Sequence, residues 1–151
     1  MNDEEILRYY TMDSYFFRVL NNTLKLAKEP KDFFVVGEPF NKMYSAIKSR
    51  YKTHRSEVEK VYRKAQLTTQ EDTFLKNNIG SYIEILAFIS TSKEENKALN
   101  FENQNNRFTI IEFDLKCPES LGNGYADLSD ISEFPDESEI LINAMNIFKV
   151  K

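Results

Sequence analysis

Three short segments of the chain carry side chains that could bind a ligand or act on it. Residues 61–63 (Val-Tyr-Arg) place an arginine in a strand-forming run, and residues 88–92 (Phe-Ile-Ser-Thr-Ser) end a strand in three hydroxyls. Further along, Glu137 and Glu139 enter an apolar run. Because residues two apart in an extended chain project to the same face, we expect these two carboxylates to converge on one ligand.

Each of these features, taken alone, is common in proteins without an active site. A lone arginine in a strand is usually a surface residue or protects an edge strand. Serine and threonine at a strand end often cap the next helix, which Thr91 or Ser92 could do here. Glu-x-Glu is ordinary surface charge in an acidic protein, and Phe101 is most simply a core residue. The joint occurrence of the segments, in this order and next to strands, favours an enzyme.

The order arginine, Ser-Thr-Ser, Glu-x-Glu resembles the arginine–serine–glutamate signature of mono-ADP-ribosyltransferases. That family includes arginine-modifying vertebrate ectoenzymes and actin-modifying bacterial binary toxins. Residues 88–92 are similar to its Phe-hydrophobic-Ser-Thr-Ser strand, with Ala98 and Phe101 where the family keeps an alanine and a phenylalanine. Residues 139–142 (Glu-Ile-Leu-Ile) and 148–150 (Phe-Lys-Val) are similar to its C-terminal pattern. The resemblance covers roughly residue 60 to the C-terminus and, more loosely, the helical N-terminal part.

The resemblance implies a reaction in which NAD is cleaved between nicotinamide and ribose. A carboxylate that faces the positive charge developing on the ribose stabilises the transition state more than the ground state, and Glu139 has that position. Arg63 would pair with the NAD phosphates. Ser90 would orient Glu139 or the ribose, and Phe101 would stack on the nicotinamide. Backbone groups of Lys64 would hold the carboxamide.

The resemblance also implies the acceptor. A guanidinium, with a pKa above about 12, is a poor nucleophile while charged, so a neighbouring carboxylate must hold it and take its proton. In the family, glutamate at the position of Glu137 accompanies arginine acceptors. The expected reaction is transfer of ADP-ribose from NAD to arginine side chains of an acceptor protein, with release of nicotinamide.

Two features differ from the family or extend it. Lys64 stands where the family often has glycine, which places a bulky side chain beside the expected nicotinamide pocket. Residues 132–136 (Ser-Glu-Phe-Pro-Asp) are acidic and would suit a basic acceptor surface. Substitution of Glu133 or Asp136 by lysine tests that hypothesis.

The rest of the chain must supply the elements that hold these segments. Apolar residues at helical spacing predict a helix from Ser14 to just before Pro30 and a second after Pro39. A capping box at residues 68–71 (Thr-Thr-Gln-Glu) predicts another helix, and residues 93–101 suit a short one. Alternation predicts strands over residues 60–65, 82–90, 108–115, 139–142 and 146–150.

Helices followed by strands are typical of an α+β fold. We expect a single ADP-ribosyltransferase-like domain over residues 1–151. Its helical part (1–56) would pack on a β-rich part (57–151), in which two mostly antiparallel sheets form a cleft for NAD.

Composition excludes several other classes of protein. The chain has 151 residues, 24 acidic and 20 basic, so its net charge of −4 lacks the basic surface of a nucleic-acid-binding protein. One cysteine cannot form an internal disulfide, and a lone His54 with Cys117 does not make a zinc site, so no metal is expected. No apolar run is long enough to span a membrane, and no secretory signal is evident.

These features predict a soluble protein, cytoplasmic as written, and leave a secreted effector or toxin open. Two alternatives to the transferase also remain: an NAD glycohydrolase that uses water as acceptor, and an inactive copy of the fold that acts as an interaction module.

Overall fold

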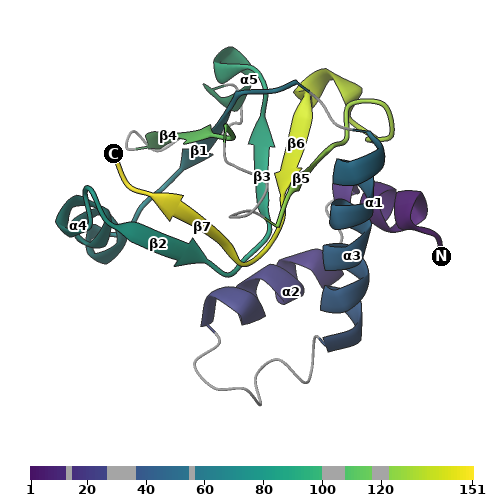
Figure 1. Ribbon diagram of the computed structural model, residues 1–151, viewed down its shortest axis with the longest axis horizontal. Coiled ribbons are helices and arrows are strands. Elements are labelled where there is room, and N and C mark those ends of the chain that lie inside the picture. The colour runs from purple at the N-terminus through teal and green to yellow at the C-terminus, as the bar shows by residue number, and fades with distance from the viewer. Residues whose placement is uncertain (13–14, 27–36, 55–56, 100–107, 117–122) are drawn as a thin grey trace.

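The computed structural model describes residues 1–12, 15–26, 37–54, 57–99, 108–116 and 123–151. Its N-terminal part is helical, as expected (Figure 1). The helices are α1 (Asp3–Thr11), α2 (Tyr15–Leu26) and α3 (Gly37–Thr53). A capping box begins α1: the Asn2 side chain accepts from the Glu5 amide at 2.8 Å, and the Glu5 carboxylate accepts from the Asn2 amide at 2.7 Å. No helix was predicted here.

The remaining described helices connect strands. The capping box expected after residue 67 is confirmed: Thr68 and Glu71 exchange hydrogen bonds of 2.8 and 3.1 Å at the start of α4 (Thr69–Asn77). A shorter helix, α5 (Glu95–Leu99), lies inside the range expected for it.

The strands form two antiparallel sheets, which confirms the predicted α+β fold. The larger sheet has the order β4-β1-β3-β6-β5, and a separate pair is formed by β2 and β7 (Figure 1). The strand bounds in the larger sheet are β4 (Thr109–Asp114), β1 (Lys60–Ala65), β3 (Ile89–Ser92), β6 (Glu139–Ile142) and β5 (Tyr125–Asp127). The pair consists of β2 (Tyr82–Ile85) and β7 (Asn146–Lys149).

The prediction of a single strand over residues 82–90 was wrong. The chain leaves the small sheet after Ile85 and enters the large sheet at Ile89, with Ala87 and Phe88 buried between them. An alternating pattern reports which face of a strand is buried and does not report to which sheet the strand belongs. β5 was not predicted, because three residues are too few for a period to be recognised.

The large sheet is apolar on both faces. On β6, Leu141 belongs to a core shared with residues of α1, α2 and α3, whereas Ile140 and Ile142 pack on the opposite face with Val61 and Phe113. Every residue of β6 is buried. A polar side chain on this strand must therefore lie inside the protein.

Candidate active site

The pairing of β3 with β6 brings two of the predicted site residues together. Ser92 lies opposite Glu139 and Ser90 opposite Leu141, so Ser90, Ser92 and Glu139 project to the same face of the sheet. The Ser90 hydroxyl donates a hydrogen bond of 2.7 Å to Glu139 Oε1. Thr91 points to the other face, where its hydroxyl donates to the carbonyl of Ile140 at 2.7 Å.

Arg63 reaches the same pair from the neighbouring strand. β1 runs antiparallel to β3, and Arg63 Nη1 donates to the backbone carbonyl of Ser90 at 2.9 Å. Residues 63, 90 and 139 are far apart in the chain, yet hydrogen bonds link Arg63 to Ser90 and Ser90 to Glu139. Arg63 is half-buried, and Ser90 links it to the carboxylate.

Glu139 is the buried charge of this group, with 5% of its surface exposed. Burial raises its pKa to about 7, the Ser90 hydrogen bond works against this shift, and the charge of Glu137 adds to it. A carboxyl group with a pKa near neutrality is typical of functional sites, because such sites often bury the group and so destabilise its charged form.

Glu137 does not lie on an extended strand with Glu139, so the geometric reason given for their convergence was wrong. Glu137 ends a short 3-10 helix, η2 (Pro135–Glu137), and Ser138 has left-handed backbone angles, φ 48 and ψ 47. A turn, rather than the pleat of a strand, therefore sets the direction of Glu137. The two carboxylates still interact electrostatically, and burial raises the pKa of Glu137 as well.

Of the two remaining predicted site residues, Lys64 and Phe101, the structure describes only Lys64. Lys64 is on β1, and the register that sets Tyr62 opposite Ser92 brings its backbone toward Ser90. Its ammonium lies 4.3 Å from the centre of the Phe108 ring, in cation–π contact. Phe101 lies outside the described residues.

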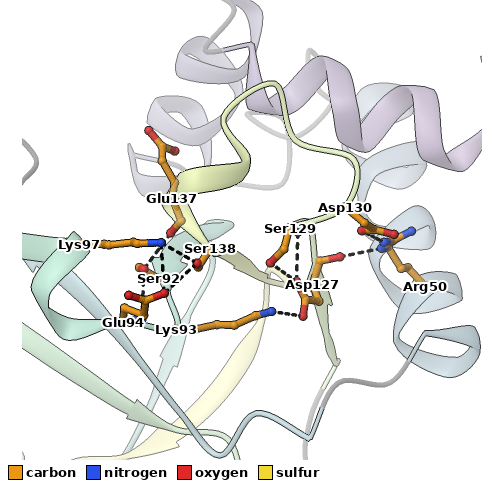
Figure 2. A network of polar contacts seen from close by, with 10 residues as sticks. All are labelled: Arg50, Ser92, Lys93, Glu94, Lys97, Asp127, Ser129, Asp130, Glu137 and Ser138. Atoms are coloured by element: carbon orange, nitrogen blue, oxygen red, sulfur yellow. Dashed lines mark hydrogen bonds and ion pairs between the residues drawn. The ribbon is translucent and has the colours of Figure 1, made fainter.

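The segment that leads to Glu137 is held by basic residues that the sequence analysis did not single out. Arg8 Nε of α1 pairs with Glu133 at 2.6 Å, and Arg50 of α3 pairs with Asp130 (Figure 2 shows the second pair). Glu133, expected to meet an acceptor, thus already has a cation on this chain. No spacing rule could have found these pairs, because Arg8 and Glu133 are 125 residues apart.

The described residues contain no group of three or more His, Cys, Asp or Glu that could hold a metal ion. They also contain no helix that is both long and apolar enough to cross a membrane.

The chain matches the family model of the ADP-ribosyltransferase exoenzyme over residues 1–151. HopU1 of Pseudomonas syringae pv. tomato DC3000, an ADP-ribosyltransferase, has a TM-score of 0.67 at 22% identity, over 89% of this chain and 57% of its own. Vis from Vibrio splendidus, an ADP-ribosyltransferase toxin solved with agmatine, has a TM-score of 0.65 at 19% identity, over 98% and 66%. The Salmonella SpvB ATR domain has a TM-score of 0.63 at 20% identity, over 96% and 76%.

At these identities the likeness to solved structures shows the fold, and the chain spans less than two thirds of HopU1 and of Vis. No curated protein matches it significantly. The match to the family model covers residues 1–151, and the arrangement of helices and antiparallel sheets agrees with it. The chain belongs to the ADP-ribosyltransferase exoenzyme family.

Proposed function

We propose that this domain transfers ADP-ribose from NAD to the guanidinium group of protein arginine side chains and releases nicotinamide. The observation that carries the proposal is the half-buried Ser90–Glu139 hydrogen bond, with Arg63 attached to the same serine and Glu137 within electrostatic reach. The solved relatives include a toxin, so we further propose that the domain acts as a toxin or effector on a protein of another cell.

The side chains present fit NAD as substrate. NAD supplies an ADP-ribosyl group whose leaving group, nicotinamide, is already cationic. Glu139 accepts a hydrogen bond from a ribose hydroxyl and places a negative charge beside the ribose, where positive charge develops as the bond to nicotinamide breaks. With a pKa of about 7, Glu139 is only partly ionised at neutral pH, and the cationic substrate favours its charged form.

Ser90 and Arg63 prepare this site. The Ser90 hydroxyl holds one Glu139 oxygen, so the carboxylate does not have to be ordered when the substrate binds. The Ser90 carbonyl holds the Arg63 guanidinium, a planar and permanently charged group suited to the phosphates of NAD. From the family resemblance, we propose that Lys64 holds the carboxamide through its backbone and that Phe101 stacks on the nicotinamide.

Glu137 is the proposed acceptor residue. Its carboxylate binds the incoming guanidinium and takes a proton from it as the new bond to ribose forms. Burial raises the pKa of Glu137, which makes it a better proton acceptor than an exposed glutamate. Vis was solved in complex with agmatine, a small guanidino compound, which supports a guanidinium acceptor in this fold.

The test measures two products from the same reaction. The domain is incubated with NAD and agmatine, nicotinamide release is followed, and ADP-ribosyl-agmatine is quantified by mass spectrometry. A protein substrate is then used to locate the modified side chain. We expect Glu139→Gln to abolish both products. We expect Glu137→Gln to lower transfer by about a hundredfold or more while nicotinamide release continues.

Glu84→Gln is the matched control, since this glutamate lies on the exposed side of β2, which belongs to the smaller sheet. Nicotinamide release without any ADP-ribosylated guanidine would show an NAD glycohydrolase instead. A Glu139→Gln variant with unchanged nicotinamide release and NAD binding would favour the inactive interaction module.

A further inference from the structure

A small polar cluster holds the residue between the two site glutamates. Lys97 Nζ lies 3.1 Å from Glu94 Oε1 and donates to Ser138 Oγ at 3.1 Å. The Ser138 hydroxyl in turn donates to Glu94 Oε1 at 3.2 Å, so the three side chains close a triangle (Figure 2). We call these three residues, Glu94, Lys97 and Ser138, the Ser138 clamp.

Two of the three clamp residues, Glu94 and Lys97, come from one short segment at the start of α5. Glu94 precedes α5 and accepts from the amides of Lys97 and Ala98 through its backbone carbonyl, so the Glu94 and Lys97 side chains lie one turn apart on the same side. The backbone is held as well, since the Lys93 amide donates to the Ser138 carbonyl at 3.1 Å. Ser138 is therefore bound through both its hydroxyl and its main chain.

Ser138 needs such support because its backbone conformation is costly. A left-handed φ of 48 is unfavourable for a residue with a side chain, and glycine does not occupy this position. The preceding residue, Glu137, is also held through its backbone, because the Ser92 hydroxyl donates to the Glu137 carbonyl at 2.8 Å. These contacts, together with the hydrogen bond from the Ser138 amide to the Pro135 carbonyl at 3.2 Å, hold the turn in this conformation.

The turn determines where Glu137 points. Figure 2 shows the Glu137 side chain directed away from the clamp, while only its backbone faces Ser92 and Lys97. The Lys97 ammonium is paired with Glu94 and Ser138. We propose that Lys97 and Glu94 are positioning residues, which hold the Ser138 turn and thereby aim the Glu137 carboxylate at the acceptor guanidinium.

This proposal rests on the proposed function, because it concerns the same carboxylate. It also predicts a split between the two half-reactions. Glu139 is held independently of the clamp, by the pairing of β6 with β3 and by the Ser90 hydroxyl. Loosening the clamp should therefore disturb the acceptor side and leave NAD cleavage unchanged.

The experiment compares Lys97→Met with the wild type in the full chain. Nicotinamide release without acceptor reports on Glu139, and kcat/KM for agmatine reports on Glu137. We expect kcat/KM for agmatine to fall about tenfold or more, mainly through a higher KM, with acceptor-independent nicotinamide release within about twofold of wild type. Lys97→Arg keeps the charge and should restore part of the loss.

Lys76→Met is the matched control, since it removes a helical lysine paired with Asp72 at 2.6 Å on α4. It should alter neither activity. Ser138→Ala removes the clamp hydroxyl but leaves a residue with a side chain at the left-handed position. It should lower kcat/KM for agmatine as Lys97→Met does, so that the conclusion does not depend on a single variant.

The possible failures are distinct. Equal loss of both activities in Lys97→Met and Ser138→Ala would mean that the clamp only supports the fold, and unchanged transfer in both would mean that it positions nothing; either result overturns the proposal. A wild type that releases nicotinamide but never modifies agmatine or protein arginine refutes the proposed function, and this inference with it.

Discussion

Replacing Glu139 by glutamine should inactivate the domain and remove a loss of stability that the wild type undergoes as the pH rises. Glu139 is 5% exposed, and burial raises its pKa to about 7. In the unfolded chain a glutamate has a pKa of about 4.3. The folded protein therefore holds this proton over a pH range in which the unfolded chain has lost it. The stabilisation from neutral Glu139 is complete below about pH 4.3 and is lost as the pH rises through about 7.

The size of the effect follows from the two pKa values. One pKa unit corresponds to about 1.4 kcal/mol, so raising the pKa of Glu139 from about 4.3 to about 7 contributes about 3.7 kcal/mol in total. Integrated between about pH 5 and pH 8, the wild type should lose about 2.5 kcal/mol of unfolding free energy through this group. Glutamine has the same shape and carbonyl oxygen but no titration, so the variant should lack this loss.

The assay is urea denaturation of both proteins at several pH values between about 5 and 8. The quantity compared is the unfolding free energy of Glu139→Gln minus that of the wild type. This difference should rise by about 2–3 kcal/mol over the range, whatever its absolute value. Glu84→Gln, which removes a carboxylate from the surface, serves as control.

A difference that stays flat with pH would refute the reasoning, because it would mean that Glu139 titrates in the folded domain as it does in the unfolded chain. A difference that falls with rising pH would mean that the site stabilises the anion. In that case the carboxylate would be preformed, and substrate binding would not be needed to favour it.

Two further predictions concern the support of the site. Gly124→Ala should lower the free energy of unfolding, measured by urea denaturation, by about 2 kcal/mol or more. The reason is that φ at this residue is +84 and the new methyl group would lie 2.9 Å from Tyr51 Cγ. A loss below about 0.5 kcal/mol would show that neither the backbone angle nor the close approach constrains this position. Lys93→Met should lower the free energy of unfolding by about 1–2 kcal/mol, because it removes the ammonium group that lies 2.5 Å from the Asp127 carboxylate. Burial opposes the charged form of Asp127, but Lys93 and Ser129 together keep its pKa below the ordinary value. The difference from wild type should therefore shrink as the pH falls below about 4, and a constant difference would contradict this account.

Much of the secondary structure could be predicted because its signals are local. The capping box of Thr68 and Glu71 and the alternation of residues 60–65 depend on neighbours within a few positions, and both were confirmed. The break at residues 86–88 could not be found in this way. It depends on which sheet accepts each half of the run, and that is decided by distant strands.

The candidate site shows the same division. The residue types and their order pointed to Arg63, Ser90 and Glu139, and in the fold Ser90 bonds Glu139 through its hydroxyl and Arg63 through its backbone carbonyl. For Glu137 the residue type pointed to an acceptor role but the assumed strand geometry was wrong, since a left-handed Ser138 separates the two glutamates. The residues that hold this turn, Glu94 and Lys97, carried no recognisable pattern.

The amino-acid sequence by itself determined the family, the order of helices and strands, and the side chains capable of chemistry, because these depend on residue type and short-range spacing. Only the tertiary structure decided how strongly Glu139 holds its proton and where Glu137 points. Both depend on which distant groups exclude water or donate hydrogen bonds, and such contacts exist only after β1, β3 and β6 have paired.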